Sequence, residues 1–505
     1  MCPHIKTTNP LGVVIKQSSI SGIVTYLGAF IGFVNSVLLF PAFLSTEELG
    51  LIRVLPNIAF MLLPLVQLGT SQALLKFSPE IKKQQNGLPQ LLGLITLSTL
   101  LGAILMSLGI VLFKADFVAL FETKSPLVNN YIPVIVALIF IVAIYSLVET
   151  YSRILLKIIA MNLIREILLR ILTGIAVLLY FYELIDLDTL VYGLILIYGF
   201  CLMALIVYLM FLGELRFSFR FSSVSRELMY RMANFSLYSI IGASGAYIVL
   251  NIDQVMVTSL LGLDENGIYS TSFYFAVMIE LSKRPILQIT TPLISQAFEN
   301  NRLADVQKMH RQLSINLMII ASLFFVGIVA NLDNIYALMP NGSDYSLGRN
   351  VIIIIGISKL IDMTFANNSE IIVMSRYYRF NVVSIFCLSM IMVVLNSYLI
   401  PIYGMDGAAM ATLLSISVFN LVKMTFLRWK LNITPFSIST LKMLGIFGVV
   451  LFMGLYLPYC YNTYIDLMAR SGIITITLGV LVLGLRISPE ANGIYNKRIK
   501  PKLPW

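Results

Sequence analysis

The 505-residue sequence contains few charged residues, and this scarcity excludes a water-soluble protein. Only 12% of the residues are Asp, Glu, Lys or Arg, whereas a soluble domain carries about 25%. Hydrophobic residues make up 58% of the chain and fall into separate apolar runs. Each run has about 20 or more residues, which is enough for a helix to cross a hydrocarbon core of about 30 Å.

Histidine and cysteine are also scarce. The only histidines are His4 and His310, in the N-terminal leader and in a predicted inner loop, so an imidazole catalyst has no good candidate. The four cysteines lie far apart, at Cys2, Cys201, Cys387 and Cys460. Without a Cys-x-x-Cys pair, they argue against a disulfide framework or a thiolate metal site. We therefore expect neither an enzyme nor a bound metal or other cofactor.

The apolar runs and the polar breaks between them predict about fourteen transmembrane helices. The first seven cover residues 17–40, 52–76, 91–113, 128–149, 158–182, 187–212 and 235–261. The other seven cover residues 268–298, 313–332, 351–374, 380–400, 404–427, 441–461 and 465–487. The first run has no cleavage site after it, which indicates a retained helix and not a removed signal peptide. The sequence thus predicts an all-α polytopic membrane protein.

Charged residues in the loops alternate from one side of the predicted membrane to the other. If the N-terminus is cytoplasmic, most Lys and Arg residues fall on the inner side, as the positive-inside rule requires. The opposite loops are comparatively acidic and contain Glu47, Glu48, Asp116, Glu122, Glu183, Asp186, Asp188, Asp264 and Glu265. This alternation favours an even number of spans with both termini cytoplasmic. It also explains the net charge of +10 without nucleic acid as a partner.

The chain repeats an acidic turn that closes with glycine and leads directly into a helix. The first copy is at residues 43–51, after the first span, and the second is at residues 260–269, after the seventh span. Two like-oriented halves of six spans are therefore predicted. We expect an N-terminal lobe at 1–215, a C-terminal lobe at 216–430, and two further helices with a basic cytoplasmic tail at 431–505.

These features together resemble the polysaccharide flippase family of the Wzx type, within the multidrug/oligosaccharidyl-lipid/polysaccharide exporter superfamily. The resemblance rests on the number of spans and the half-repeat. It also rests on two short motifs, Leu44-Ser45-Thr46-Glu47-Glu48-Leu49-Gly50 and Asn251-Ile252-Asp253-Gln254 followed by Gly267-Ile268-Tyr269. The similarity covers most of the chain, but the motifs are short.

The resemblance implies two six-helix lobes around a central cavity that opens alternately to each side, in a bacterial cytoplasmic membrane. Family members move polyprenyl-diphosphate-linked oligosaccharide units, precursors of O-antigen, capsule or exopolysaccharide, to the outer leaflet. Glycan polymerases or assembly proteins would be partners. The nearest alternative is a cation-coupled drug exporter of the same superfamily, which would need carboxylates in its first lobe. Glu166, which lies between Arg165 and Arg170, is the only carboxylate well inside a first-lobe span.

The predicted eighth span carries the strongest candidate site, Glu280, Lys283 and Arg284, directly before Pro285. Charges within a span are unfavourable unless they face a cavity or a partner. Glu280 can pair with only one of the two cations at its three- or four-residue spacing, which leaves another to meet a diphosphate. Pro285 is expected to break the helix. The alternative is an internal ion pair that only fixes two helices.

Four other charged residues are predicted to support this site. Asp253 in the seventh span is either a partner of the cations or a tether between helices. Lys359 and Asp362 in the tenth span are three residues apart and are expected to compensate each other. Arg165 in the fifth span has no local partner, because Glu166 and Arg170 have the spacing of a pair. Arg165 either meets a diphosphate or extends to the inner membrane interface.

Overall fold

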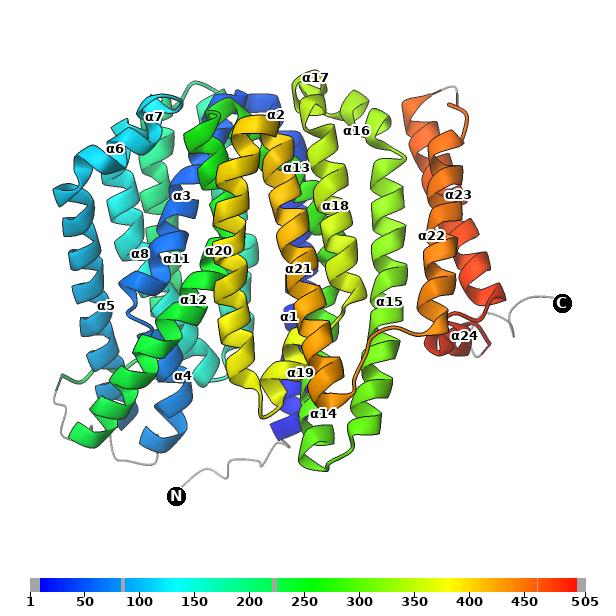
Figure 1. The fold of residues 1–505 in the computed structure, drawn as a ribbon. Coiled ribbons are helices and arrows are strands. Elements are labelled where there is room, and N and C mark those ends of the chain that lie inside the picture. The colour runs from blue at the N-terminus through cyan, green and yellow to red at the C-terminus, as the bar shows by residue number, and fades with distance from the viewer. Residues whose placement is uncertain (1–9, 83–86, 220–224, 461, 497–505) are drawn as a thin grey trace. The chain divides into compact units, whose positions relative to one another are not determined.

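The computed structural model describes residues 10–82, 87–219, 225–460 and 462–496 (Figure 1). Within these ranges the secondary structure is helical and contains no β-strand, which confirms the predicted all-α class. His4, Cys2 and the basic tail after residue 496 lie outside the described residues. The chain divides into two compact units, unit 1 (Met1–Gly267) and unit 2 (Ile268–Trp505). The predicted lobe boundaries at residues 215 and 430 remain a proposal.

Among the described residues, eleven helices are long and apolar enough to cross a membrane, and one bent pair raises this number to twelve. The predicted fifth and eighth spans coincide with consecutive helical segments, Ile158–Phe181 and Leu263–Glu299, which carry several charged residues. The first segment contains the π-helical turn Leu163–Leu168, and the second is interrupted after Glu280. The count of fourteen therefore remains a prediction.

Unit 1 is built from helices that run along one another through most of their length. In chain order they are α1 (Pro10–Phe33), η1 (Val34–Leu39), α2 (Phe40–Phe43), α3 (Thr46–Val66), α4 (Thr70–Ile81), α5 (Gly87–Leu112), α6 (Lys114–Glu122), α7 (Pro126–Asn130), α8 (Ile132–Ile154), α9 (Ile158–Asn162), η2 (Leu163–Leu168), α10 (Leu169–Phe181), α11 (Leu187–Phe211) and α12 (Arg226–Leu260). The segments η1 and η2 are π-helical turns within longer helices. Such turns commonly occur at functional sites.

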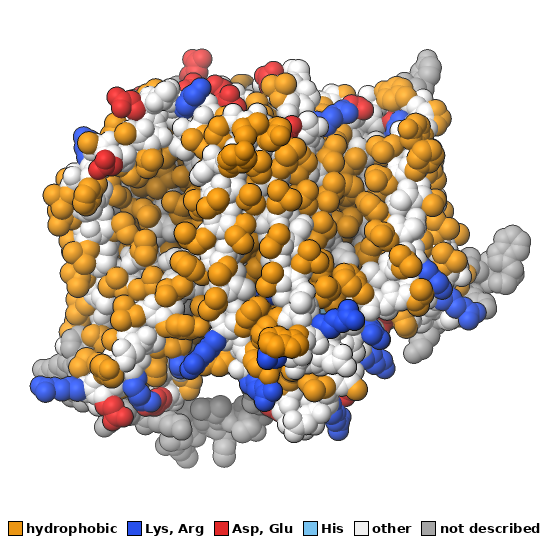
Figure 2. Space-filling model, in the orientation of Figure 1, with side chains coloured by type: hydrophobic (Ala, Val, Ile, Leu, Met, Phe, Trp, Pro, Cys, Tyr) orange, Lys and Arg blue, Asp and Glu red, His pale blue; other side chains and the backbone are white. Residues whose placement is uncertain are grey.

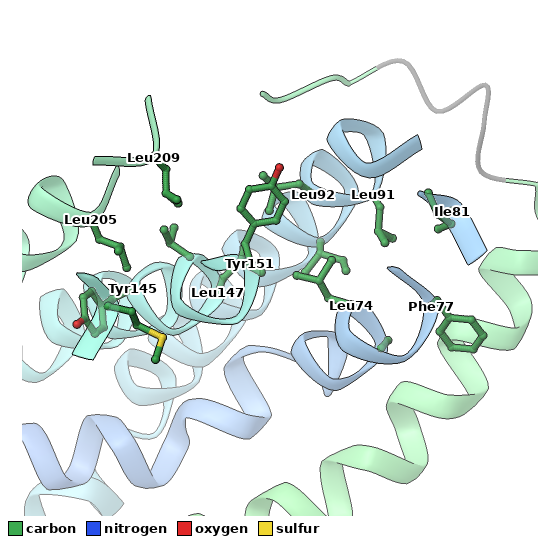
Figure 3. Packing of buried hydrophobic residues seen from close by; sticks show 14 of the residues in the cluster. Leu74, Phe77, Ile81, Leu91, Leu92, Tyr145, Leu147, Tyr151, Leu205 and Leu209 are labelled. Atoms are coloured by element: carbon green, nitrogen blue, oxygen red, sulfur yellow. The ribbon is translucent and has the colours of Figure 1, made fainter. Parts of the chain in front are cut away.

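The core of unit 1 lies where α4, α5, α8 and α11 meet (Figure 3). Leu74, Leu91, Leu147 and Leu205 come one from each of these helices, and each is almost completely buried. Tyr151 closes one side of this cluster and donates a hydrogen bond from its hydroxyl to the Glu214 carbonyl at 2.9 Å. This packing fixes α8, which carries charged residues described below.

The two acidic turns recognised in the sequence pack against each other within unit 1. A Cβ atom added to Gly50 would overlap the backbone of Leu263, and one added to Gly267 would overlap the backbone of Thr46. Thr46 Oγ1 donates to Asp264 Oδ1 at 2.5 Å, and the Asn266 amide donates to the Gly50 carbonyl at 3.1 Å. Only glycine permits so close an approach of two backbones. The sequence repeat therefore corresponds to a paired contact.

Unit 2 begins within α13 (Leu263–Glu280) and contains the rest of the chain. It continues with α14 (Lys283–Glu299), α15 (Leu303–Val329), α16 (Leu332–Leu338), α17 (Gly342–Tyr345), η3 (Ser346–Gly348), α18 (Arg349–Thr364), α19 (Asn368–Met374), α20 (Tyr378–Tyr403), α21 (Met405–Leu431), α22 (Ile438–Tyr456), α23 (Thr463–Gly484) and α24 (Pro489–Ile494). Its core contains Phe325 of α15, Met363 of α18, Val450 of α22 and Leu478 of α23.

Hydrophobic side chains cover the flanks of the helices in each unit on the face shown in Figure 2. In unit 1, acidic side chains are prominent near α6 and α7, and basic ones near α4. In unit 2, basic side chains gather near α14 and α24. Apolar flanks with charged ends are what a bilayer requires, because hydrocarbon cannot solvate charge.

Candidate functional site

The candidate site in unit 2 starts at a break between two helices. Helix α13 ends at Glu280, and α14 begins at Lys283, with Leu281 and Ser282 between them. Pro285 lies in the first turn of α14, where its missing N–H group leaves no helical hydrogen bond unmade. Glu280 and Lys283 therefore lie at the ends of two helices and are not neighbours on one helix face.

Both residues pair with α18 instead of with each other. Lys359 Nζ lies 2.6 Å from Glu280 Oε2, and Lys283 forms an ion pair with Asp362. The side chains are largely buried, with exposed fractions of 15% and 28% in the first pair and 13% and 21% in the second. Lys359 and Asp362, which were expected to compensate each other, thus form their ion pairs with residues of α13 and α14. Charges on α13 and α14 provide closer partners than the three-residue spacing along α18.

Helix α21 extends this group of charges with two polar residues that the sequence analysis did not select. The Asn420 amide donates to Asp362 Oδ1 at 3.0 Å. Lys423 is completely buried and donates to Ser369 Oγ and Asn381 Oδ1, at 2.7 Å each. Its ammonium also lies 3.8 Å from the centroid of the Phe419 ring, which is cation–π geometry.

The sequence contained a signal for these two residues. Lys423 falls within the predicted span at 404–427, where a cation is unfavourable unless it has a partner. Asn420 and Lys423 are three residues apart on an otherwise apolar helix, so they share a face. We name Glu280, Lys283, Lys359, Asp362, Asn420 and Lys423 the α18 charge network.

A second break, between α18 and α19, lies next to this network. Ala366 has a left-handed backbone with φ of 50°, and the two helical segments are bent by 41°. His310 Nδ1 lies 2.7 Å from Asn367 Oδ1, and Ser314 Oγ donates to the Thr364 carbonyl. His310 is therefore a buried residue of α15 that supports the break, and its predicted position in an inner loop is wrong.

Arg284 differs from its neighbour Lys283. Its side chain is exposed, and no hydrogen bond or ion pair joins its guanidinium to any other described residue. Of the two cations predicted to bind diphosphate, Lys283 is already paired with Asp362, whereas Arg284 keeps its donors available.

The remaining predicted site residues, Asp253 and Arg165, belong to unit 1. Asp253 is buried in α12, with 5% of its surface exposed. The predicted pair of Glu166 and Arg170 is confirmed, with 3.0 Å between Oε2 and Nη2. Arg165 has a partner on another helix, which spacing along the chain does not show. Its Nη1 lies 3.5 Å from Oε2 of Glu149 on α8.

A small polar pocket of about 80 Å³ lies next to the pair of Arg165 and Glu149 in unit 1. It lies at the break between α3 and α4, where Leu68 and Gly69 have positive φ values of 50° and 69°. Gln67 is anchored there by a hydrogen bond from its amide to the Ala143 carbonyl at 3.1 Å. Glu149 and Arg165 line the pocket. The side chain of Glu149 is only 6% exposed.

A larger pocket of about 370 Å³ in unit 2 is almost entirely apolar. It lies between α15, α18 and α22, and its lining includes Met318, Leu360, Phe365, Leu441 and Leu444. A pocket of this size and character suits a hydrocarbon chain.

The two sites contain fixed charges and hydrogen-bond donors. Among the described residues, no group of three or more His, Cys, Asp or Glu side chains is placed to hold a metal ion. What the arrangement can do chemically is hold anionic groups and compensate charge inside a membrane.

The fold is similar to the folds of several membrane transporters of known structure. The structure is similar to the lipid II flippase MurJ in an inward closed conformation, with a TM-score of 0.75 and 13% identity over 93% of this chain and 100% of that chain. It is also similar to an inward-facing multidrug resistance MATE family transporter of the MOP superfamily, with a TM-score of 0.62 and 14% identity over 83% of this chain and 98% of that chain. A Vibrio cholerae MATE transporter is similar with a TM-score of 0.56 and 13% identity, over 83% of this chain and 99% of that chain.

The sequence identifies the family within this class. Residues 14–298 match the family described as polysaccharide biosynthesis protein, so the chain belongs to that family. The resemblance inferred from the motifs is thereby confirmed. A search of curated proteins found no match.

Proposed function

We propose that this protein is a flippase that moves a polyprenyl-diphosphate-linked oligosaccharide across the bacterial cytoplasmic membrane by alternating access, with both termini in the cytoplasm. The observation that carries the proposal is the α18 charge network, held at helix breaks inside the apolar helices of a polysaccharide biosynthesis protein. Buried charges at broken helices are typical of transport pathways. Partners that use the translocated glycan, such as a polymerase, belong to the same proposal.

Arg284 is the residue to which we assign the diphosphate. A guanidinium offers parallel donors that match phosphate oxygens, and that of Arg284 is exposed without a protein partner among the described residues. Lys283 holds Asp362 and so shapes the site without being available for a ligand. The other members of the α18 charge network keep α13, α14, α18 and α21 together around it.

The apolar pocket between α15, α18 and α22 supports the lipid part of the proposed substrate. Its lining offers almost no hydrogen-bonding groups, which suits part of an isoprenoid chain and not a sugar. A polar glycan needs the opposite environment, which the charged and amide side chains of the network provide. The two environments together match the two ends of a lipid-linked oligosaccharide.

A cation-coupled drug exporter is the second candidate, because exporters of the MATE family have a similar fold. The substrates of such an exporter are free molecules, so loss of the exporter would not cause lipid-linked sugars to accumulate. The family match favours the flippase, since it concerns polysaccharide biosynthesis.

Deletion of the gene from its host provides the direct test. We expect a lipid-linked oligosaccharide to accumulate on the cytoplasmic side of the membrane. The measurement is extraction and glycan analysis of inverted and right-side-out vesicles. Accumulation of a drug without any change in lipid-linked sugars would reject the flippase and support the exporter.

The role of Arg284 is tested by Arg284→Gln. The variant should reach the membrane at the normal level and lose export of the surface glycan. Arg311→Gln is a matched control, because Arg311 is an exposed cation on the neighbouring helix α15. Normal glycan display with Arg284→Gln would reject the assignment. The double alanine variant of Lys283 and Arg284 is less informative, because it also leaves Asp362 without its cation.

A further inference from the structure

Glu149 of α8 is a buried carboxyl group with too few hydrogen-bond donors. Its Oε2 has one long contact, at 3.5 Å from Arg165 Nη1, and its Oε1 is buried without a hydrogen-bond partner among the described residues. An ionised carboxylate can accept about four hydrogen bonds. A buried carboxylate with a single distant donor is therefore held weakly in its charged form.

The elements around Glu149 bring several charged or titratable groups toward it. They are Arg153 and Tyr145 on α8, Arg165 and Glu166 on η2, and Tyr247 on α12, with Tyr198 and Cys201 of α11 next to Tyr145. From the break between α3 and α4 the lining side chains are the neutral Gln67, Ser71 and Gln72. The pocket of about 80 Å³ has room for about two or three water molecules. Glu149 thus borders a polar space through which a proton can reach it.

The two partners differ in accessibility. The Arg165 side chain is 49% exposed, whereas that of Glu149 is 6% exposed. An anionic group can reach the guanidinium of Arg165 without entering the space occupied by Glu149. Because a phosphate oxygen at normal hydrogen-bond distance is a better acceptor than a carboxylate at 3.5 Å, the guanidinium would turn toward the anion and away from Glu149.

We infer that Glu149 couples anion binding to proton uptake. In the anion-free protein, the Glu149 carboxylate is paired with the Arg165 guanidinium. When an anionic phosphate group binds Arg165, the carboxylate loses its ion pair with that guanidinium and takes one proton from solvent through the pocket. The products are a neutral Glu149 carboxylic acid and a guanidinium–phosphate pair. The inference rests on the proposed function in one respect, since it makes Arg165 a second cation, besides Arg284, that can bind the diphosphate of the substrate.

Isothermal titration of the full-length protein in nanodiscs with farnesyl diphosphate tests this coupling. Titrations in buffers of different ionisation enthalpy give the number of protons taken up per bound ligand. We expect the wild-type protein to take up about one proton more than Glu149→Gln. The wild-type Kd should fall by up to about tenfold, relative to that of the variant, for each unit decrease in pH. Titration of the ligand itself is common to both proteins and cancels in the comparison.

Three further variants separate the proton acceptor from a general effect on the fold. Glu149→Asp keeps a carboxyl group and should retain the extra proton. Glu166→Gln removes the neighbouring carboxylate of η2, which is paired with Arg170, and should behave as the wild-type protein does. Arg165→Gln should weaken binding by about tenfold or more and abolish the extra proton.

Equal proton uptake by the wild-type protein and Glu149→Gln would overturn the inference, and so would the absence of farnesyl diphosphate binding by both. The test is independent of the deletion experiment. Accumulation of lipid-linked oligosaccharide together with equal proton uptake rejects the coupling alone. The extra proton without such accumulation supports the coupling and rejects the proposed function.

Discussion

Unit 2 holds Glu280 and Asp362 in ion pairs that cross from one helix to another, whereas unit 1 leaves Glu149 with a single contact of 3.5 Å. Asp362 also accepts a hydrogen bond from Asn420. Glu149 has one oxygen with no partner among the described residues. Both centres are buried in apolar helices, so the difference lies in how completely each carboxylate is compensated.

This difference separates a structural role from a responsive one. A buried pair with good geometry loses much stability when one partner is removed, because the other charge remains buried without compensation. Removal of a poorly compensated carboxylate costs less stability, and such a group changes its protonation more readily. The following substitutions test that distinction, beginning with the largest expected effect.

Asp362→Asn should destabilise the protein by about 3 to 5 kcal/mol, because Lys283 would remain buried without its anion. The measurement is denaturant unfolding of the purified protein in detergent. Asp333→Asn provides the control, since Asp333 pairs with Arg349 at the surface and its side chain is 87% exposed. The control should change stability by about 1 kcal/mol or less. A similarly small change for Asp362→Asn would remove the contrast between the units.

Lys423→Met should have an intermediate effect of about 1 to 2 kcal/mol. The methionine restores hydrocarbon packing, but Ser369 and Asn381 lose their hydrogen-bond donor. The loss is smaller than for Asp362→Asn because no directly paired opposite charge is left behind. Lys430→Met on the same helix is the control, since Lys430 is exposed and its replacement should change stability by about 0.5 kcal/mol or less. Equal unfolding midpoints for the two variants would contradict this prediction.

Glu149→Gln makes the same change from carboxylate to amide in unit 1, and it should alter stability by about 1 kcal/mol or less in either direction. The amide keeps the shape of the side chain, while the charge that it removes was poorly compensated. Unfolding is measured under the conditions used for Asp362→Asn. A loss as large as that for Asp362→Asn would mean that Glu149 is as firmly held as the unit 2 carboxylates.

Glu166→Gln should have the smallest effect, about 0.5 kcal/mol. The pair of Glu166 and Arg170 has a four-residue spacing on one helix, which contributes little. Arg170 also donates a hydrogen bond to the Gly28 carbonyl, so it keeps a partner after the substitution. Thermal unfolding of the variant next to the wild-type protein checks the value. A loss of more than about 2 kcal/mol would show that the local pair is as important as the pairs between helices.

The sequence was sufficient for features that depend on local pattern. The apolar runs predicted the helices, and the repeated acidic motif marked the starts of α3 and α13, although these helices begin before the glycines, at Thr46 and Leu263. The pair of Glu166 and Arg170 was also predictable, because four residues along a helix place two side chains next to each other.

The partners of Lys283, Lys359 and Arg165 were not predictable in this way. Spacing along a helix tells which residues share a face, but not which face of another helix lies opposite. Glu280 and Lys283 appeared to be neighbours until the break after α13 separated them. The burial of Lys423, which has 0% exposure, likewise depends on how α21 packs against its neighbours.

The sequence by itself therefore determined that this protein is a helical membrane protein with charges inside its spans, because hydrophobicity and helical periodicity are local properties of the chain. Only the tertiary structure decided which of those charges are compensated. Compensation depends on contacts between residues such as Lys283 and Asp362, which are distant in sequence and are brought together by helix packing. In a medium that cannot solvate charge, that packing determines which ionisable group remains able to respond to a ligand.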